Sequence, residues 1–172
     1  MRFLSCLVLA ATMTLAAADE CGFDPEGSAA LKKHSEDGGK RSLAESVKAS
    51  DELAARYPSS FDVQSFYLGG YRYTRREAWP AYRDSLVKRA LGNPEDKLAA
   101  TLAAMALHRT DTPRAIELLE KVAPSYSPAA LKLAEFYQAG RFENTEKSSP
   151  TLRTLGECVR TPLLTWRRLG YE

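Results

Sequence analysis

Apolar residues recur with a period of about 3.6 residues along most of the chain after residue 18. This period places them on one face of an α-helix, and the alternating β-branched runs that are typical of strands do not occur. Six segments carry the helical pattern: 43–57, 62–73, 78–91, 95–108, 114–123 and 128–139. A further helix is expected to begin near Ser149. The pattern therefore predicts an all-α protein.

Polar residues followed by proline mark many of the expected helix starts. A polar side chain at the N-cap accepts a backbone hydrogen bond, and the fixed φ of proline suits the first helical position. This pair occurs at Asn93-Pro94, Thr112-Pro113, Ser127-Pro128, Ser149-Pro150 and Thr161-Pro162. Two capping boxes, Ser42-x-x-Glu45 and Thr74-x-x-Glu77, predict further starts. Short helices joined by such brief turns should pair antiparallel with their neighbours.

Prolines also recur between the expected helix pairs. Pro58, Pro94 and Pro128 are separated by 36 and 34 residues, and each follows one pair of helices and precedes the next. A period of this size is typical of arrays of stacked helix pairs. The spacing thus favours a helical-repeat architecture.

Two stretches of the chain resemble known helical repeats. Leu68-Gly69-Gly70-Tyr71-x-Tyr73, followed by Ala78, Tyr82, Ala90 and Pro94, resembles a degenerate tetratricopeptide repeat. Residues 130–140 carry Leu-Ala-x-x-Tyr-x-x-Gly and resemble the first helix of a Sel1-like repeat. The resemblance covers residues 41–140 and implies antiparallel helix pairs stacked as a short α-solenoid, in which small residues let paired helices approach.

The chain departs from this family in two places. Residues 141–148 lack the usual glycine-valine turn, and no Trp-Tyr pair follows in the second helix. The small-residue position also drifts in spacing from Gly70 to Ala103 to Ala134. A non-repetitive helical bundle is therefore the alternative fold.

The N-terminus has the parts of a secretory signal peptide. Arg2 precedes an apolar run over residues 3–17, and Ala16, Ala17 and Ala18 supply an Ala-x-Ala cleavage site. The run is short of the roughly 20 apolar residues that span a bilayer, although a retained N-terminal anchor is the alternative. We expect residues 1–18 to be removed and residues 19–172 to form a single domain, periplasmic or secreted, with no stable membrane insertion.

Two cysteines survive this cleavage. Cys6 is lost with the signal peptide, whereas Cys21 and Cys158 remain near the two ends of the domain. In an oxidising compartment they predict one disulfide bond, the alternative being two unpaired thiols. Two cysteines and two distant histidines, His34 and His108, do not have the spacing of metal ligands, so no metal site is expected.

The charge of the chain is nearly balanced. Cleavage removes one basic residue and lowers the formal net charge from +2 to +1. Nucleic-acid binding needs clustered excess Lys and Arg, so no nucleic-acid partner is expected. The balance is uneven along the chain, however: residues 61–92 carry a net charge of +3 and residues 19–60 a net charge of −3. An acidic partner would suit the middle of the chain.

The resemblance to helical repeats implies binding, because stacked helix pairs present a concave surface to a protein or peptide partner. Residues 66–83 are dense in Tyr, Trp and Arg, the residue types that dominate interface hot spots. Candidate partner-binding residues are Tyr71, Arg72, Arg75, Arg76 and Trp79. For Tyr67, Tyr73 and Tyr82 we favour a packing role. An alternative function is an inhibitor or immunity-type protein that blocks a secreted enzyme.

The sequence carries no catalytic motif. It lacks Gly-x-Ser-x-Gly, His-Glu-x-x-His and a phosphate-binding glycine loop. Glu117 and Glu120 share an expected helix face, but solvated surface glutamates are the common explanation of such a pair. We therefore expect no enzyme activity and no cofactor. A hydrolase that acts on cell-wall or carbohydrate polymers is the further alternative, because two carboxylates can suffice for that reaction.

Overall fold

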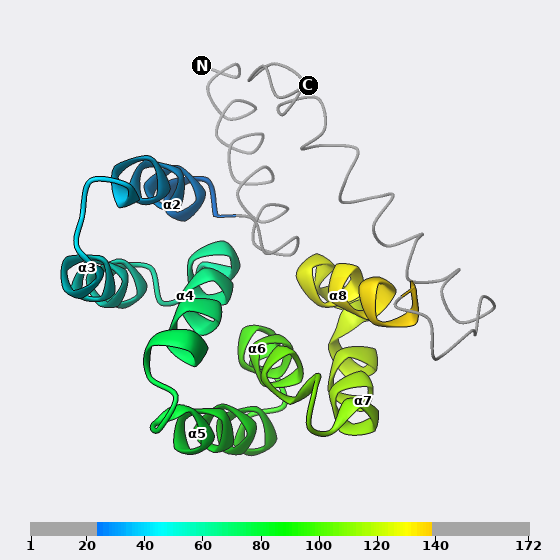
Figure 1. Cartoon of the computed structure of the whole chain (residues 1–172). Coiled ribbons are helices and arrows are strands. Elements are labelled where there is room, and N and C mark those ends of the chain that lie inside the picture. The colour runs from blue at the N-terminus through cyan, green and yellow to red at the C-terminus, as the bar shows by residue number, and fades with distance from the viewer. Residues whose placement is uncertain (1–23, 139–172) are drawn as a thin grey trace, which may run out of the picture.

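The computed structural model describes residues 24–138. In this range the chain forms seven α-helices, one 3₁₀ turn and no strand, which confirms the all-α prediction (Figure 1). The elements are α2 (Pro25–Gly38), α3 (Leu43–Arg56), α4 (Phe61–Thr74), α5 (Trp79–Gly92), α6 (Lys97–Leu107), α7 (Thr112–Val122), η1 (Ala123–Ser125) and α8 (Ser127–Gln138). None of these helices combines the length and the apolar character that a membrane span needs.

Several predictions concern residues outside this range. The signal peptide over residues 1–18, the disulfide between Cys21 and Cys158, and the helix starts at Ser149 and Thr161 all lie outside the described residues.

Helix α3 begins where its capping box predicts. The Ser42 backbone N–H donates to Glu45 Oε2 at 2.8 Å, and the Glu45 N–H donates to Ser42 Oγ at 3.3 Å. The second predicted box is wrong, because Thr74 is the last residue of α4 and its hydroxyl donates to the Gly70 carbonyl at 2.9 Å. Helix α5 begins only at Trp79.

Aspartate rather than the residue before proline caps two of the other helices. Asn93 ends α5 instead of starting α6, and Asp96 caps α6 by accepting the Ala99 N–H at 2.8 Å. Asp111 caps α7 by accepting the Arg114 N–H at 3.2 Å. The N-cap predicted at Asn93 is therefore displaced by three residues to Asp96, and the one predicted at Thr112 by one residue to Asp111, because these carboxylates accept the first free N–H groups.

Helix α2 was not predicted from the sequence. Asp24 caps it by accepting the N–H groups of Glu26 and Gly27 at 3.1 and 3.0 Å, and Pro25 occupies its first position. This is the same polar-proline signal that marks other starts. The helix lacks a clear apolar stripe, and Gly27 is its only buried residue.

Helices that follow one another along the chain pack together in most cases. The pairs are α2 with α3, α3 with α4, α5 with α6, α6 with α7, and α7 with α8. Alternate helices also touch, α2 with α4, α4 with α6, and α6 with α8. In Figure 1, α4, α6 and α8 lie on the inside of a curve and α3, α5 and α7 lie around its outside.

Contacts at two levels along α2 and α4 show that these two helices run in the same direction. Gly27, at the start of α2, lies against Ser60, the residue before α4. Farther along, the His34 ring meets the Phe66 ring edge-on with 5.4 Å between centroids.

Helices α6 and α8 are parallel for the same reason. Lys97 Nζ, at the start of α6, donates to the Ser125 carbonyl just before α8 at 3.2 Å. His108, directly after α6, stacks on Phe136 in the last turns of α8 with 4.2 Å between centroids.

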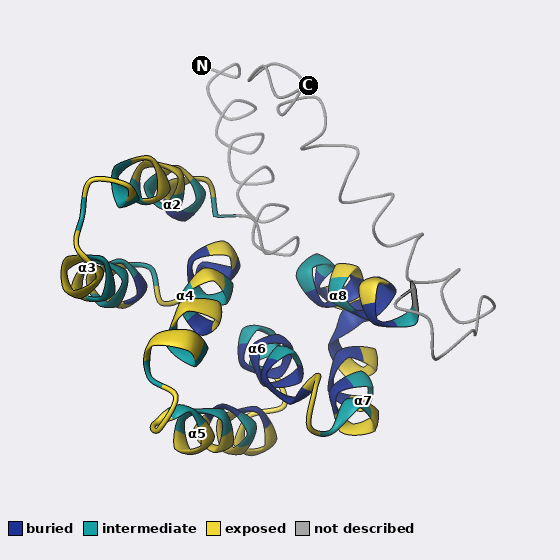
Figure 2. Ribbon diagram, viewed as in Figure 1, coloured by how far each residue is buried: buried dark blue, intermediate teal, exposed yellow. Residues whose placement is uncertain are grey.

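The hydrophobic core is centred on α6. Most of its residues are buried, and alanines at positions such as 99, 103 and 104 are fully inaccessible, which lets α5, α7 and α8 approach closely. The core cluster runs from α4 to α8 and includes no residue of α2 or α3. Figure 2 shows this gradient, with dark blue dense on α6 and sparse on α2 and α3. The N-terminal end of the described fold is therefore the more thinly packed one.

Candidate functional site

The five predicted binding residues lie around the junction of α4 and α5. Tyr71 and Arg72 belong to the last turns of α4, Arg75 follows its end, and Trp79 begins α5. Arg76 lies in the turn between the two helices and is exposed. Four of these side chains form a cluster with Tyr67, Tyr82 and Asp51. Arg76 is outside this cluster, and no ion pair or hydrogen bond joins its side chain to a residue within 24–138.

Arg75 is held by a carboxylate and a phenol. Its Nη1 and Nη2 atoms donate to the two oxygens of Asp51 at 2.9 and 2.6 Å. Nη1 also donates to Tyr67 Oη at 3.0 Å, and that hydroxyl donates to Asp51 Oδ1 at 3.0 Å. Because Asp51 belongs to α3, this closed triangle ties the end of α4 to α3. The sequence gives no sign of the partnership, since Asp51 and Arg75 are 24 residues apart.

The pKa values in this triangle fit a fixed ion pair. Hydrogen bonds from Arg75, and then from Tyr67, hold the pKa of Asp51 below its ordinary value. The bond to Asp51 raises the pKa of Arg75 further, and burial raises the pKa of Tyr67. All three groups therefore keep their ordinary protonation states at neutral pH.

Aromatic rings fill the space between α4 and α5. The Tyr71 ring stacks on Tyr82 with 4.2 Å between centroids, and the Arg75 guanidinium lies 4.9 Å from the Tyr71 ring on α4. Tyr67 meets both rings edge-on at 5.8 and 6.3 Å. Because these large side chains separate the helices, α4 and α5 are not among the closely packed pairs.

The outer edge of this cluster holds the remaining predicted residues. Trp79 lies 6.3 Å from Tyr82, and the Arg72 guanidinium lies 5.8 Å from the Trp79 ring. The packing role predicted for Tyr73 is wrong, because its side chain is 69% exposed on the opposite side of α4 from Tyr71. Tyr67 and Tyr82 are partly buried, as the sequence analysis expects.

A small apolar pocket opens beside the triangle, between the start of α3 and the end of α4. Its volume is about 90 Å³, enough for one aliphatic side chain. Leu43, Val47, Phe66 and Gly70 line it together with atoms of the triangle. Leu43 is 74% exposed and Phe66 is 41% exposed, so the pocket has apolar walls that the described chain leaves open to solvent.

Gly70 does not have the packing role that the repeat resemblance implies. A Cβ atom at Gly69 or Gly70 would meet nothing within 4 Å among the described residues. Both glycines are exposed in the middle of α4, where glycine costs about 1 kcal/mol relative to alanine. Gly70 thus widens the pocket rather than bringing two helices together.

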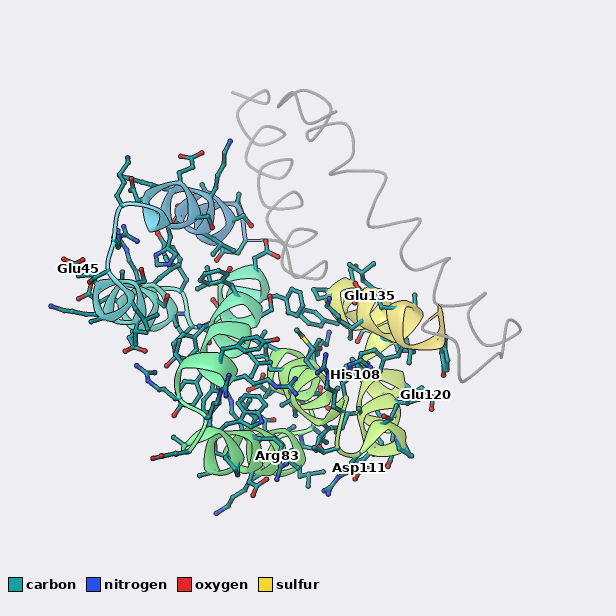
Figure 3. All side chains as sticks on the ribbon, viewed as in Figure 1. Glu45, Arg83, His108, Asp111, Glu120 and Glu135 are labelled. Atoms are coloured by element: carbon teal, nitrogen blue, oxygen red, sulfur yellow. The ribbon has the colours of Figure 1, made fainter. Side chains whose placement is uncertain are left out.

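The carboxylates of Glu117 and Glu120, on the other side of the fold, each contact a different partner. Glu117 pairs with Lys121 at 2.8 Å, and Glu120 accepts the Tyr137 hydroxyl at 2.7 Å. Burial, reinforced by this bond, raises the pKa of Tyr137 to about 12. Figure 3 shows Glu45 at the opposite end of the molecule from Glu120 and Glu135. No group of three or more His, Cys, Asp or Glu side chains gathers as a metal site within residues 24–138.

Comparisons with models of protein families, with curated proteins and with solved structures found no match for this chain.

Proposed function

We propose that this protein is an exported helical-repeat scaffold that binds a protein or peptide partner through the α3–α4 pocket and the exposed Arg76 in the turn that follows α4. The single observation that carries the proposal is the open apolar pocket itself. Its walls include Leu43 and Phe66, both exposed, and one side of it is α3, which contributes no residue to the core cluster. Exposed apolar surface next to Tyr and Arg side chains is typical of interaction sites.

The repeat architecture is part of this proposal. Helix α2 packs parallel on α4 with α3 between them in the chain, and α6 packs parallel on α8 with α7 between them. Stacked helix pairs produce this arrangement. The wide, aromatic-filled gap between α4 and α5 departs from a regular repeat. A short solenoid with one irregular pair accounts for both observations.

The pocket and its surroundings suggest the chemistry of the partner. A volume of about 90 Å³ with apolar walls suits one Leu, Ile, Val or Met side chain. Arg76 is exposed in the turn that follows Arg75, a residue of the pocket wall. We infer a partner segment that inserts an aliphatic side chain into the pocket and places an acidic residue near Arg76.

Arg75 has a different role from the one that the sequence analysis assigns to it. Its guanidinium is already satisfied by Asp51 and Tyr67, so a partner carboxylate would have to compete with a two-point ion pair. In this proposal Arg75 shapes the pocket wall and keeps α3 against α4, while Arg76 meets the partner.

The glycine pair offers a matched test of the pocket. Gly70→Leu places a side chain in the pocket, whereas Gly69→Leu places the same side chain on the neighbouring exposed position outside it. We expect a partner captured from cell-envelope extract to be lost with Gly70→Leu and retained with Gly69→Leu. Equal capture by both variants, with both folded by circular dichroism, would refute the pocket as the binding site.

The contribution of Arg76 is tested by charge reversal. We expect Arg76→Glu to weaken capture of the same partner and Lys88→Glu, an exposed change on α5, to leave it unaltered. Capture by the wild-type protein should also weaken as salt rises, because exposed charges are screened.

The identity of the captured partner separates scaffold from inhibitor. If the partner is an enzyme and the purified protein lowers its activity in proportion to complex formation, the inhibitor or immunity function is the correct one. If the partner is a resident envelope protein without such activity, the scaffold function stands.

Export and the disulfide have their own measurements. We expect the protein recovered from the envelope fraction to begin near Asp19, and recovery with Met1 at its N-terminus would refute cleavage. Mass analysis without reductant should show Cys21 joined to Cys158, and two free thiols would refute the bond.

A further inference from the structure

His34 connects three helices at the thinly packed end of the fold. It belongs to α2, and its Nε2 atom lies 3.3 Å from Ser50 Oγ on α3. Its Nδ1 atom lies 3.3 Å from Arg41 Nη1 in the turn after α2. Its ring also meets the Phe66 ring of α4 edge-on. One imidazole therefore contacts α3, α4 and the turn that leads out of its own helix.

The surrounding hydrogen bonds specify the protonation state of this ring. The Ser50 hydroxyl donates to the Ser46 carbonyl at 2.8 Å, so Ser50 Oγ is left to accept the N–H of His34 Nε2. A guanidinium can only donate, so Nδ1 must accept from Arg41. The neutral tautomer with its proton on Nε2 satisfies both contacts, whereas the imidazolium satisfies only one.

We propose that His34 is an acid-sensitive latch, and that protonation of its Nδ1 atom releases α2 from α3 and α4. A proton on Nδ1 removes the hydrogen bond from Arg41 and places two N–H donors and two positive charges 3.3 Å apart. Opening of α2 separates the ring from Arg41 and exposes it to water, so protonation favours the opened helix.

The charges around the ring are mixed. They are Lys33 and Asp37 of α2, Arg41 of the following turn, and Glu52 and Arg56 of α3, while α4 presents the uncharged Phe66. Burial lowers the pKa of His34, Arg41 lowers it further, and Asp37 acts in the opposite direction. A histidine whose pKa is lowered by folding stabilises the fold above its unfolded pKa of about 6.5, and this contribution is lost as the pH falls through the folded pKa.

Helix α2 buries little of its surface. Gly27 is its only buried residue, and a further side-chain link to α4 is a hydrogen bond from the Ser28 hydroxyl to the exposed Asp62. Release of α2 would also uncover more of Phe66, which forms a wall of the α3–α4 pocket. The latch requires no partner, so failure of the binding proposal would not refute it.

Nuclear magnetic resonance of the whole protein tests the latch directly, because the chain contains only two histidines. We expect the His34 ring signals to titrate with a pKa below about 6.5. Across the same pH range the hydrogen-exchange protection factors of residues 25–38 should fall while those of α6 hold. Each unit by which the pKa is lowered corresponds to about a tenfold fall in α2 protection.

Variants separate the latch from general acid sensitivity. We expect His34→Gln, which takes up no proton, to make α2 protection independent of pH between 7.5 and 5, and His108→Gln to keep the wild-type pH dependence. Arg41→Gln should raise the pKa of His34, because the nearest positive charge is removed. A His34 pKa at or above its ordinary value, or α2 protection that is unchanged while the ring titrates, would overturn the proposal. Both readouts come from the wild-type protein and hold even if a variant fails to fold.

Discussion

Alanine replacements of two glycines should change the stability of this protein in opposite directions. Gly27 lies in the first turn of α2, where a Cβ atom would stand 2.8 Å from Ser60 Cβ and 2.5 Å from Asp24 Oδ2. Gly69 lies in the middle of α4, where a Cβ atom would meet nothing within 4 Å of the described residues. The chemical change is the same at both sites, so only the tertiary surroundings can make the results differ.

The magnitudes follow from these distances. At Gly27 the new methyl group meets the stiff Cβ of Ser60 and the carboxylate that caps α2, and relief requires a shift of α2 or the loss of the cap. Overpacking of this kind costs about 1–3 kcal/mol, and the gain in helix propensity of up to about 1 kcal/mol offsets only part of it. At Gly69 only the propensity gain applies, so we expect about 0.5–1 kcal/mol of stabilisation.

Urea unfolding followed by circular dichroism, together with hydrogen exchange of residues 25–38, measures both effects. Exchange is needed because a thinly packed helix can open without global unfolding. Ser60→Gly provides the rescue: Ser60 Oγ is buried without a hydrogen-bond partner in the described fold, and glycine is tolerated at an N-cap. The double variant Gly27→Ala, Ser60→Gly should recover most of the lost stability. Stabilisation by Gly27→Ala alone would refute the close approach of α2 to α4.

Three further predictions test the core and the triangle. Leu119→Ala should cost about 2–5 kcal/mol in an unfolding experiment because this side chain is fully buried, whereas Leu131→Ala at an exposed position of α8 should cost less than about 1 kcal/mol. Arg75→Ala should lower the free energy of unfolding by about 1–2 kcal/mol, since it leaves Asp51 without its two-point partner at a partly exposed site. Arg76→Ala should change it by no more than about 0.5 kcal/mol. Equal costs for the two variants would refute the distinction between these arginines. Because Arg75 lowers the pKa of Asp51, the stabilisation from Asp51 should be fully present above its unfolded pKa of about 4 and be lost as the pH falls through its folded pKa. Asp51→Asn should therefore differ from wild type at pH 7, and the difference should shrink as the pH falls in acid titrations of stability.

The candidate site shows how far residue types alone can identify a surface. The density of Tyr, Trp and Arg in residues 66–83 located a real cluster, since Tyr71, Arg75 and Trp79 lie around one group of stacked rings. It gave no indication that Arg75 is already paired, nor that Tyr73 is exposed. Those facts depend on where α3 and α5 lie relative to α4.

The sequence by itself determined the secondary structure over most of the described chain, because helix periodicity and helix ends are local. Ser42 and Glu45 cap a helix through their own backbone, and the apolar stripes of α3 to α8 are visible within each segment. Helix α2 was not predicted because Leu31 is its only large apolar residue, although Asp24-Pro25 signals its start.

The tertiary structure alone decided which side chains meet, because contacts between residues far apart in the chain depend on helix packing. It brought Asp51 to Arg75 and His34 to Ser50, and it required glycine at position 27 but not at positions 69 and 70. Each of these contacts joins residues of different helices or of the turns that flank them. Periodicity assigns a residue to a face of its own helix and carries no information about which helix covers that face.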